Sequence, residues 1–446
     1  MANPAGFQQI GVVEGFYGRV WSEAEREAFI AGLAPFGLNT YLYAPKHEPA
    51  LGAALLEPLD KAAAQRLHRL QRLCEERGIA LLAGLHLEPP YDPALDAHRE
   101  ALAQKARQIA ELGLAGFAVL FDDLPAGRSP LGPHGADPFG GSLAAAQAHA
   151  FRALHDALER GRAQATWLVC PGRYTLDPVL EEISGTFEPD YLARLHAALP
   201  SEVPWLWTGP RVCSPTVTPA DAAGYRALLG AGGARRPLAL WDNYPVNDAR
   251  MQGRLHLDPL GGRAPDLPAA VQGYLFNPLL QPGLGLIPGA SCLAYANDPA
   301  GYDPTAAWHA ALQAFLPPAL HGPFAEFAAL TRPFQQAGGL PPVWPRGAFP
   351  ILQRLVRAWP SLSAGEPAEP FLAIDLRRVL ESLAQGLPPA MAGEAAPWLD
   401  RLRRALALID ASAQGAPPES LGPLRAQYSP PRGDMPTPEV LGPWFP

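Results

Sequence analysis

Eight short apolar segments, most of them separated by helix-like segments, constrain the fold of this sequence more than any other feature. The fourth segment, residues 116–121, has six apolar or small residues in a row, which is typical of a strand covered on both faces. Strands that alternate with helices pair in parallel, and eight such units predict a closed (β/α)8 TIM barrel. The other expected strands are 10–13, 39–44, 79–85, 165–169, 203–207, 237–240 and 273–276.

Helix signals fill most of the intervals between these segments. Ser22 followed by Glu25 is a capping box, which predicts a helix to about residue 35. Gly and Pro interrupt the last two expected helices, 257–268 and 281–289, so a doubly wound open sheet remains an alternative fold. The remaining expected helices are 60–77, 94–112, 142–159, 189–199 and 218–229.

The pattern changes near residue 304, which divides the chain into an expected barrel domain, 1–303, and a second region. In that second region apolar residues recur at helical spacing without strands, which predicts a C-terminal α-helical bundle domain over 304–414. A proline-rich tail, 415–446, follows it. The expected helices of the bundle are 306–315, 324–334, 349–358, 371–385 and 397–411.

Charge and composition exclude several classes of partner. The net charge is -8 and no basic stripe offsets it, so we expect no nucleic acid partner. No apolar run reaches membrane-spanning length, so we expect no membrane segment. The N-terminus has no secretory signal pattern. The four cysteines, Cys74, Cys170, Cys213 and Cys292, lie far apart and are expected to be reduced and buried, which predicts a cytoplasmic protein.

Polar and aromatic side chains cluster just after the expected strands. The carboxyl ends of the strands in a (β/α)8 barrel meet at one rim, which is where active sites are built. Acids, amides and aromatic faces with few cations suit a neutral polyhydroxylated ligand such as a sugar, although any one of these residues could instead cap a turn or pack in the core. The residues are Tyr17, Lys46, Asp122, Asp123, Tyr174, Trp241, Asn243, Asp248 and Asn277.

Asp122 and Asp123 stand side by side where the fourth segment ends. Two adjacent carboxylates repel each other, so such a pair tends to keep one group protonated and one ionised, as general acid catalysis requires. A capping Asp next to a solvated Asp is the structural alternative. His86 and Glu88 lack the spacing of a zinc site, and no phosphate-binding or dinucleotide-binding motif is present, so we expect no metal and no cofactor.

Six motifs together resemble glycoside hydrolase family 84, the O-GlcNAcase-like β-N-acetylglucosaminidases, over about residues 10–300. The resemblance implies a retaining exo-β-N-acetylglucosaminidase in which the substrate's own acetamido oxygen is the nucleophile and an oxazoline forms. It implies a GlcNAc-containing glycoside, or an O-GlcNAc-modified protein or peptide, as the substrate. The motifs are Glu14-Gly15-Phe16-Tyr17-Gly18 with Trp21, Tyr43-Ala44-Pro45-Lys46, Phe121-Asp122-Asp123, Trp207-Thr208-Gly209-Pro210, Trp241-Asp242-Asn243-Tyr244-Pro245-Val246-Asn247-Asp248, and Asn277-Pro278.

The same resemblance implies a role for each matched residue. Asp122 would orient and polarise the acetamido N–H, and Asp123 would protonate the leaving oxygen and later activate water. Tyr174 and Trp241 would line the acetamido pocket. Gly15, Lys46, Asn243, Asp248 and Asn277 would hold sugar hydroxyls, with Tyr17 and Thr208 as further substrate-binding residues. Gly172-Arg173 stands where the family usually has Thr-Glu, which leaves specificity beyond the terminal sugar open.

Two other functions remain open from the sequence. One is a hexosaminidase that acts on small GlcNAc-containing glycans, and the other is a catalytically silent sugar-binding protein. The presence of both acids argues against a silent protein, because a binding module has no need for a repelling pair. Glu14 and Asp242 are the acids that could serve as an enzyme nucleophile instead of the acetamido group. The sequence does not indicate an oligomeric state.

Overall fold

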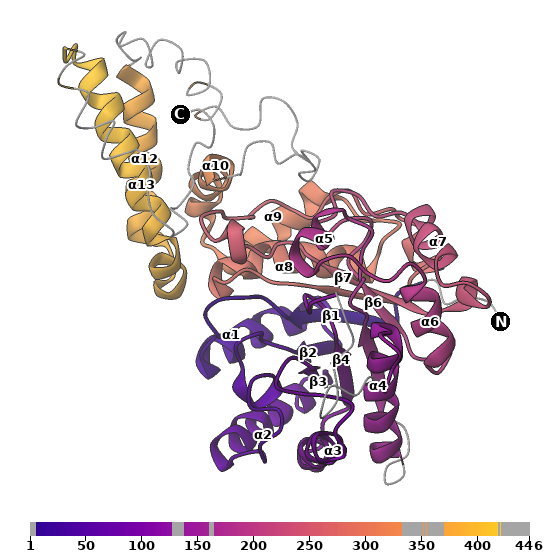
Figure 1. Cartoon of the computed structure of the whole chain (residues 1–446). Coiled ribbons are helices and arrows are strands. Elements are labelled where there is room, and N and C mark those ends of the chain that lie inside the picture. Colours follow the sequence, from indigo (N-terminus) through magenta and orange to yellow (C-terminus); the bar gives the residue numbers. More distant parts are fainter. Residues whose placement is uncertain are drawn as a thin grey trace. The chain divides into compact units, whose positions relative to one another are not determined.

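The computed structural model describes residues 6–126, 138–159, 165–331 and 370–417, together with Ile351, Arg354 and Ser420. Eight parallel strands form a closed barrel in chain order, in which β8 pairs back to β1 (Figure 1). This confirms the predicted (β/α)8 barrel and excludes the open sheet. The strands are β1 (Gln9–Glu14), β2 (Thr40–Tyr43), β3 (Ala80–His86), β4 (Gly116–Leu120), β5 (Thr166–Cys170), β6 (Trp205–Trp207), β7 (Leu238–Asp242) and β8 (Gly273–Phe276).

The barrel strands are apolar on both faces because the helices cover the outside and side chains fill the inside. All residues of β4 are buried, and its register with β3 and β5 begins at Gly116. A Cβ atom at Gly116 would lie 1.9 Å from the carbonyl oxygen of Thr166, so glycine is required where β4 approaches β5. This close approach begins the register of β4 with β5, and the Asp pair follows at the other end of the strand.

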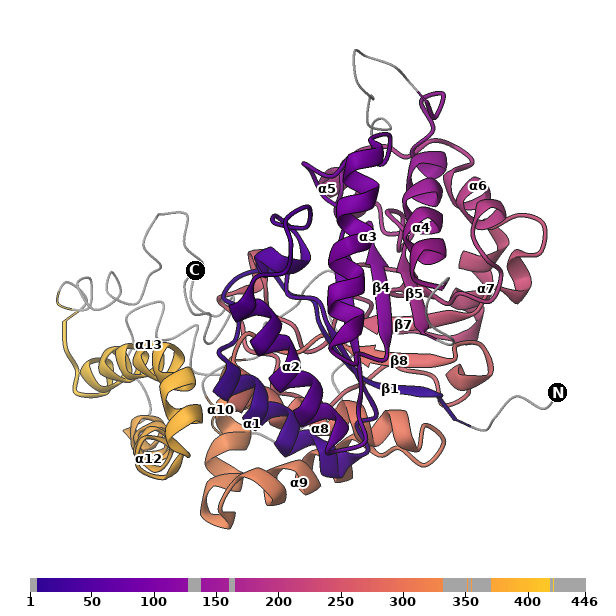
Figure 2. The same ribbon diagram turned by 90° about the horizontal axis from the view of Figure 1, so that it is seen from below.

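Seven helices lie among the described residues between β1 and β7, and Figure 2 shows α3 and α4 side by side. The predicted capping box at the start of α1 is confirmed, since Ser22 and Glu25 each accept a hydrogen bond from the other's backbone N–H. A second capping box, formed by Thr218 and Asp221, begins α7. The helices are α1 (Glu23–Leu33), α2 (Lys61–Glu75), α3 (Asp96–Glu111), α4 (Leu143–Glu159), α5 (Val179–Ser184), α6 (Tyr191–Ala198) and α7 (Pro219–Ala227).

The last two expected helices of the barrel differ from the prediction in opposite ways. Segment 257–268 is irregular except for a short 3-10 turn, Leu267–Ala269, because prolines and glycines interrupt it, so that prediction is wrong. The expected helix 281–289 exists but continues as α8, Pro282–Asn297, with Pro288 inside it. Apolar side chains along α8 are fully buried, and their packing outweighs the cost of the internal proline.

The chain divides into two compact units. The first is Met1–Tyr244, Gly262–Pro278 and Leu293–Tyr302, and the second is Pro245–Gly261, Leu279–Cys292 and Asp303–Pro446. The second unit contains the predicted C-terminal helices, as α9 (Pro304–Phe315), α10 (His321–Thr331), α12 (Pro370–Gly386) and α13 (Pro389–Ala413). The predicted domain boundary at 303/304 stays a prediction. Most of the expected helix 349–358 and nearly all of the tail lie outside the described residues.

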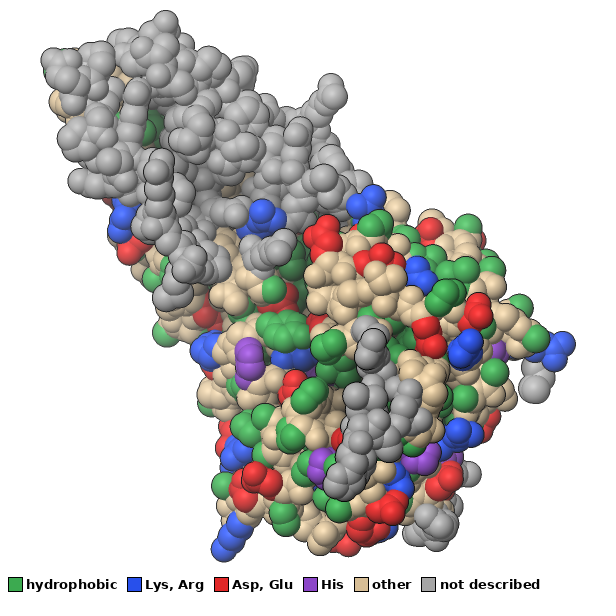
Figure 3. All heavy atoms as spheres, viewed as in Figure 1, with side chains coloured by type: hydrophobic (Ala, Val, Ile, Leu, Met, Phe, Trp, Pro, Cys, Tyr) green, Lys and Arg blue, Asp and Glu red, His purple; other side chains and the backbone are tan. Residues whose placement is uncertain are grey.

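The surface and the cysteines can be compared with the expectations from composition. No helix in the described part of the chain is long and apolar enough to cross a bilayer. On the face drawn in Figure 3, acidic and basic side chains are interspersed over the described residues. All four cysteines are free; three are buried as expected, whereas Cys213 is partly exposed.

Candidate active site

Asp122 follows β4 at the rim where the eight strands have their carboxyl ends. Its Oδ2 accepts a hydrogen bond from Nζ of Lys46, and the two side chains are only 8% and 7% exposed. Its Oδ1 is buried and has no hydrogen-bond partner. A buried acceptor without a partner is costly in a folded protein, so Oδ1 is a position where a ligand donor is expected.

Lys46 lies beside the acids and two aromatic rings. Its Nζ is 5.5 Å from the ring centroid of Tyr17 and 5.9 Å from that of Trp241. Burial alone would lower the pKa of Lys46, but the carboxylates of Asp122 and Asp123 outweigh burial and raise that pKa. Lys46 is therefore a cation at neutral pH and balances part of the negative charge of the pair.

Asp123 is held by two tyrosines rather than by a cation. Its Oδ2 accepts a hydrogen bond of 2.8 Å from Tyr17, and its Oδ1 accepts one of 2.7 Å from Tyr174. Burial and the Asp123 carboxylate raise the pKa of Tyr174 well above its usual value, so its hydroxyl remains a donor. The backbone of Asp123 is left-handed, with φ 60°, which is a strained conformation that occurs mostly where the structure needs it.

One wall of the site consists of Trp241, Asn243 and Asn277. Oδ1 of Asn243 accepts hydrogen bonds of 3.0 Å from the indole of Trp241 and from Nδ2 of Asn277, which leaves Oδ1 of Asn277 buried and without a partner. A Cβ atom at Gly15 would lie 2.3 Å from Cζ2 of Trp241, so glycine is required where the β1 loop meets this wall. The structure thus brings Gly15, Trp241, Asn243 and Asn277 together.

Thr208 follows β6 and contacts a residue of the site, since its backbone N–H donates to the carbonyl oxygen of Tyr174, at 3.3 Å. The hydroxyl of Thr208 donates to the carbonyl oxygen of Arg211, at 2.9 Å, and so holds its own loop. Asp248 belongs to the second unit, where it precedes the short helical turn Ala249–Met251. The substrate contacts of Thr208 and Asp248 stay predictions.

Glu14 and Asp242, the other strand-end acids, are each bound by an arginine and a tyrosine. Nε and Nη2 of Arg26 donate to the two oxygens of Glu14, both at 2.7 Å, and Tyr41 adds a third hydrogen bond. Arg263 donates in the same bidentate way to Asp242, which also accepts a bond of 2.8 Å from Tyr274. We call these two groups the arginine clamps. Both carboxylates have all of their oxygens engaged.

Sequence reasoning missed three residues that contact the strand-end acids or Lys46. Arg26 looks like an ordinary helix residue, Arg263 lies in the segment expected to be helical, and His86 was considered only as a zinc ligand. A basic residue on the inward face of α1 was the one available signal, because buried arginines in proteins are paired. Nδ1 of His86 lies 3.4 Å from Nζ of Lys46.

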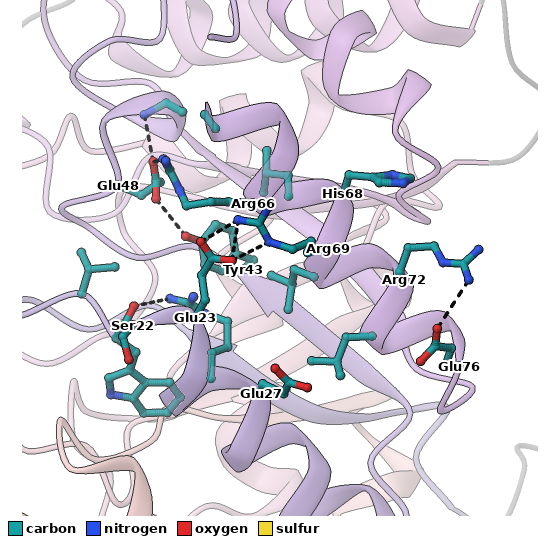
Figure 4. Close-up of a pocket in the computed structure, with 18 residues that line it drawn as sticks. Ser22, Glu23, Glu27, Tyr43, Glu48, Arg66, His68, Arg69, Arg72 and Glu76 are labelled. Carbon is teal, nitrogen blue, oxygen red and sulfur yellow. Dashed lines mark hydrogen bonds and ion pairs between the residues drawn. The ribbon is translucent and has the colours of Figure 1, made fainter. Parts of the chain in front are cut away.

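Two further observations concern metal ligands and a second hollow. Among the described residues, no group of three or more His, Cys, Asp or Glu side chains forms a ligand set for a metal ion. A separate hollow of about 510 Å³ lies between α1 and α2 (Figure 4). In it Arg69 is paired with Glu23 and Arg66 with Glu48, so these charges are satisfied within the hollow. We assign no chemistry to this hollow.

Comparisons with known proteins agree on one family. The model of the NAGidase family, beta-N-acetylglucosaminidase, matches residues 10–329. The chain is 29% identical over 271 residues to the Protein O-GlcNAcase of Rattus norvegicus and to that of Mus musculus, a match that covers 60% of this chain. It spans only 28% of the length of those relatives. An O-GlcNAc hydrolase mutant from Thermobaculum terrenum is 25% identical, with a TM-score of 0.79 over 98% of this chain and 93% of that one.

Proposed function

The chain belongs to the β-N-acetylglucosaminidase family of glycoside hydrolases, and we propose that it is a retaining exo-β-N-acetylglucosaminidase that uses the substrate's own acetamido oxygen as the nucleophile. The observation that carries this proposal is the oxygen pair of Asp122. Oδ2 is bound to Lys46, while Oδ1 is buried without a partner. An acetamido N–H is a donor of the kind that Oδ1 lacks.

In the first step, Asp122 accepts the hydrogen bond from the acetamido N–H and stabilises the positive charge that develops on this group. The acetamido carbonyl oxygen forms a bond to C1 while the bond from C1 to the leaving oxygen breaks. Asp123 enters this step in its protonated form and donates that proton to the leaving oxygen, and an oxazoline results. The proton remaining on the oxazoline nitrogen is held by Asp122.

In the second step, water attacks C1 and the bond from C1 to the oxazoline oxygen breaks. The carboxylate of Asp123 takes the proton from this water and so returns to its starting state. Two inversions at C1 give net retention. Tyr17 and Tyr174 hold the carboxyl group of Asp123, and one of their hydroxyls yields its place to the leaving oxygen or the water.

The arginine clamps support the acetamido group as the nucleophile. An enzyme carboxylate that attacks C1 needs a free oxygen near the substrate, as in the two-carboxylate mechanism. Glu14 and Asp242 have both oxygens engaged by arginine and are buried. Of the four acids that end or directly follow β1, β4 and β7, these clamps leave Asp122 and Asp123 as the two for which we propose a role in the reaction.

For the substrate, we propose a terminal β-linked GlcNAc on a protein or peptide. Two observations support this choice: the match to proteins named O-GlcNAcase and the structural likeness to an O-GlcNAc hydrolase. Trp241 and Tyr174 would line the acetamido pocket, and Lys46, Asn277 and the loop at Gly15 would hold hydroxyls. We propose a cytoplasmic location on the basis of the four free cysteines.

The test compares nitrophenyl β-GlcNAc with nitrophenyl β-glucoside. Only the first has an acetamido group, so it should be hydrolysed with a β-configured first product, while the glucoside should be essentially inert. Dialysis against EDTA should leave the rate unchanged. A comparable rate on the glucoside, or an α-configured first product, would exclude the mechanism. A glycopeptide turned over no faster than a small GlcNAc glycan would contradict the protein substrate.

A further inference from the structure

His86, the last residue of β3, contacts the lysine that is bound to Asp122. The residue is only 6% exposed, and its two ring nitrogens face different groups. Nδ1 is 3.4 Å from Nζ of Lys46, and Nε2 is 3.1 Å from the carbonyl oxygen of Ala44. A carbonyl oxygen can only accept, so the ring proton is on Nε2. Nδ1 is therefore an acceptor, and the ammonium of Lys46 donates to it.

The surroundings of His86 keep its ring neutral. Burial and the ammonium of Lys46 lower the pKa of His86 well below its usual 6.5, against the opposing hydrogen bond to Ala44. A second proton on Nδ1 would point at an ammonium group and remove the acceptor. The charged groups that meet at this ammonium are Asp122, which is bound to it, and Asp123, which attracts it.

We propose that His86 is a positioning residue that fixes the Lys46 ammonium on Oδ2 of Asp122 and so keeps Oδ1 available for the substrate's acetamido N–H. A lysine side chain is flexible, and two carboxylates attract its charge. Without a second anchor, the ammonium could bridge both oxygens of Asp122 or move toward Asp123. Either movement would block or misplace the acceptor on which the first step depends.

This inference depends on the proposed function for the identity of the substrate, whereas the contact between His86 and Lys46 can be tested without any substrate. Two amide variants separate the two bonds of the ring. In His86→Asn, the amide oxygen can take the place of Nδ1, which keeps the acceptor for Lys46 and loses the bond to Ala44. In His86→Gln, the amide nitrogen can take the place of Nε2, which keeps the bond to Ala44 and loses the acceptor.

If His86 acts through Lys46, His86→Gln should lower kcat on nitrophenyl β-GlcNAc by about 10-fold to 100-fold, as expected for a small misplacement of a reacting group, with little change in KM. His86→Asn should lower kcat by a clearly smaller factor. The opposite order, or equal losses in kcat, would mean that the hydrogen bond from His86 to the carbonyl oxygen of Ala44 is the important one. That result would overturn the proposal.

A double-mutant cycle adds a readout that a purely structural role would not give. In an Asp122→Asn background residue 122 has no carboxylate to which the Lys46 ammonium could be fixed. Adding His86→Gln should therefore lower kcat only slightly further. If the loss in kcat of the double variant equals the product of the losses of the two single variants, the inference is contradicted.

The substrate-free test is the nitrogen NMR spectrum of the histidine-labelled protein. His86 should be the neutral Nε2–H form at pH 7, and its Nδ1 resonance should move when Lys46 is changed to Met. An Nδ1–H form, an imidazolium, or no response to Lys46→Met would overturn the inference. A wild-type protein that fails to hydrolyse nitrophenyl β-GlcNAc would refute the proposed function but leave this test valid.

Discussion

The acids that end β1 and β7 differ from the acids that follow β4 in what binds them. Glu14 and Asp242 each receive two hydrogen bonds from an arginine and another from a tyrosine, so these carboxylates are neutralised and saturated. Asp122 has one oxygen on Lys46 and one without a partner, and Asp123 has only tyrosine hydroxyls. All four stand at the same rim of one barrel.

This difference separates a carboxylate that holds structure from one that can react. A bidentate arginine fixes both oxygens and the charge, which suits a permanent link between elements. A lysine or a tyrosine leaves room for a ligand hydrogen bond or a proton. In the sequence, Glu14 and Asp242 could each be a nucleophile; the arginine clamps support our proposal that they are not.

The largest expected effect is on activity, when Asp122 or Asp123 is replaced. Asp123→Asn removes the proposed proton donor and should lower turnover by about 10²-fold to 10⁴-fold for an alkyl or seryl leaving group. A nitrophenolate barely needs a proton, so oxazoline formation should survive much better with that aglycone. Asp122→Asn should slow all aglycones alike, because it weakens the charge stabilisation at the acetamido group. Rates measured for both variants over a series of leaving groups test these two expectations.

Reversed slopes in that series, steep for Asp122→Asn and flat for Asp123→Asn, would mean that the two roles are exchanged. Full activity in both variants would remove the distinction between the pair and the arginine clamps.

The next largest expected effect is a loss of stability when Asp242, an acid in an arginine clamp, loses its arginine. Arg263→Met leaves Asp242 as a buried charge without its cation, which should lower the free energy of unfolding by about 3–5 kcal/mol. Chemical denaturation measures this change. The matched control is Arg69→Met, which breaks the pair with Glu23; those side chains are 57% and 47% exposed, so the loss should be under about 1 kcal/mol.

A second variant tests the cause of that loss. Asp242→Leu combined with Arg263→Met removes both charges and should recover part of the stability, because a buried pair replaced by apolar groups is often close to neutral. A double variant as unstable as Arg263→Met alone would show that packing, rather than the orphaned charge, is responsible.

The fold followed from the sequence because its signals are local. The apolar runs gave all eight strands, and the Ser22 capping box marks the start of α1 as predicted. The two differences have different origins: prolines and glycines, which are local signals, prevented a helix over 257–268, whereas burial along α8 overrode Pro288. Burial on all sides is a property of the packed molecule, which hydrophobic spacing alone does not reveal.

The site was only partly predictable, for a different reason. The Asp pair is visible because both acids follow one strand, but the partner of each acid comes from another element. Arg263 is 21 residues from Asp242, and Lys46 is 76 residues from Asp122. Closure of the barrel brings these residues together, and no spacing rule in the sequence encodes it.

A smaller effect distinguishes the two members of the pair by backbone conformation. Asp123 is left-handed, which costs a residue with a side chain about 1–2 kcal/mol, so Asp123→Gly should be more stable than Asp123→Ala by up to about 1 kcal/mol. At Asp122, which is not left-handed, alanine should be the more stable of the two replacements. Thermal or chemical unfolding of the four variants measures the order. The same order at both positions would argue against strain at Asp123.

The smallest effect concerns a third kind of carboxylate, the capping-box acid Glu25 at the start of α1. Partial burial opposes ionisation, but hydrogen bonds from Arg19 and from Ser22 outweigh it and lower the pKa of Glu25 from 4.5 to about 2. Because the pKa is lower in the folded state, the ionised group stabilises the fold above pH 4.5, and this contribution disappears as the pH falls through about 2. Glu25→Gln should therefore cost less than about 1 kcal/mol at pH 6, and this difference from the wild type should shrink between pH 4.5 and pH 2. Urea unfolding of both proteins over that range measures it, provided that each remains two-state.

A loss of stability that grows as the pH falls would contradict the sign of the linkage. A loss as large as that of Arg263→Met would show that a partly exposed acid can stabilise the fold as much as an acid in an arginine clamp.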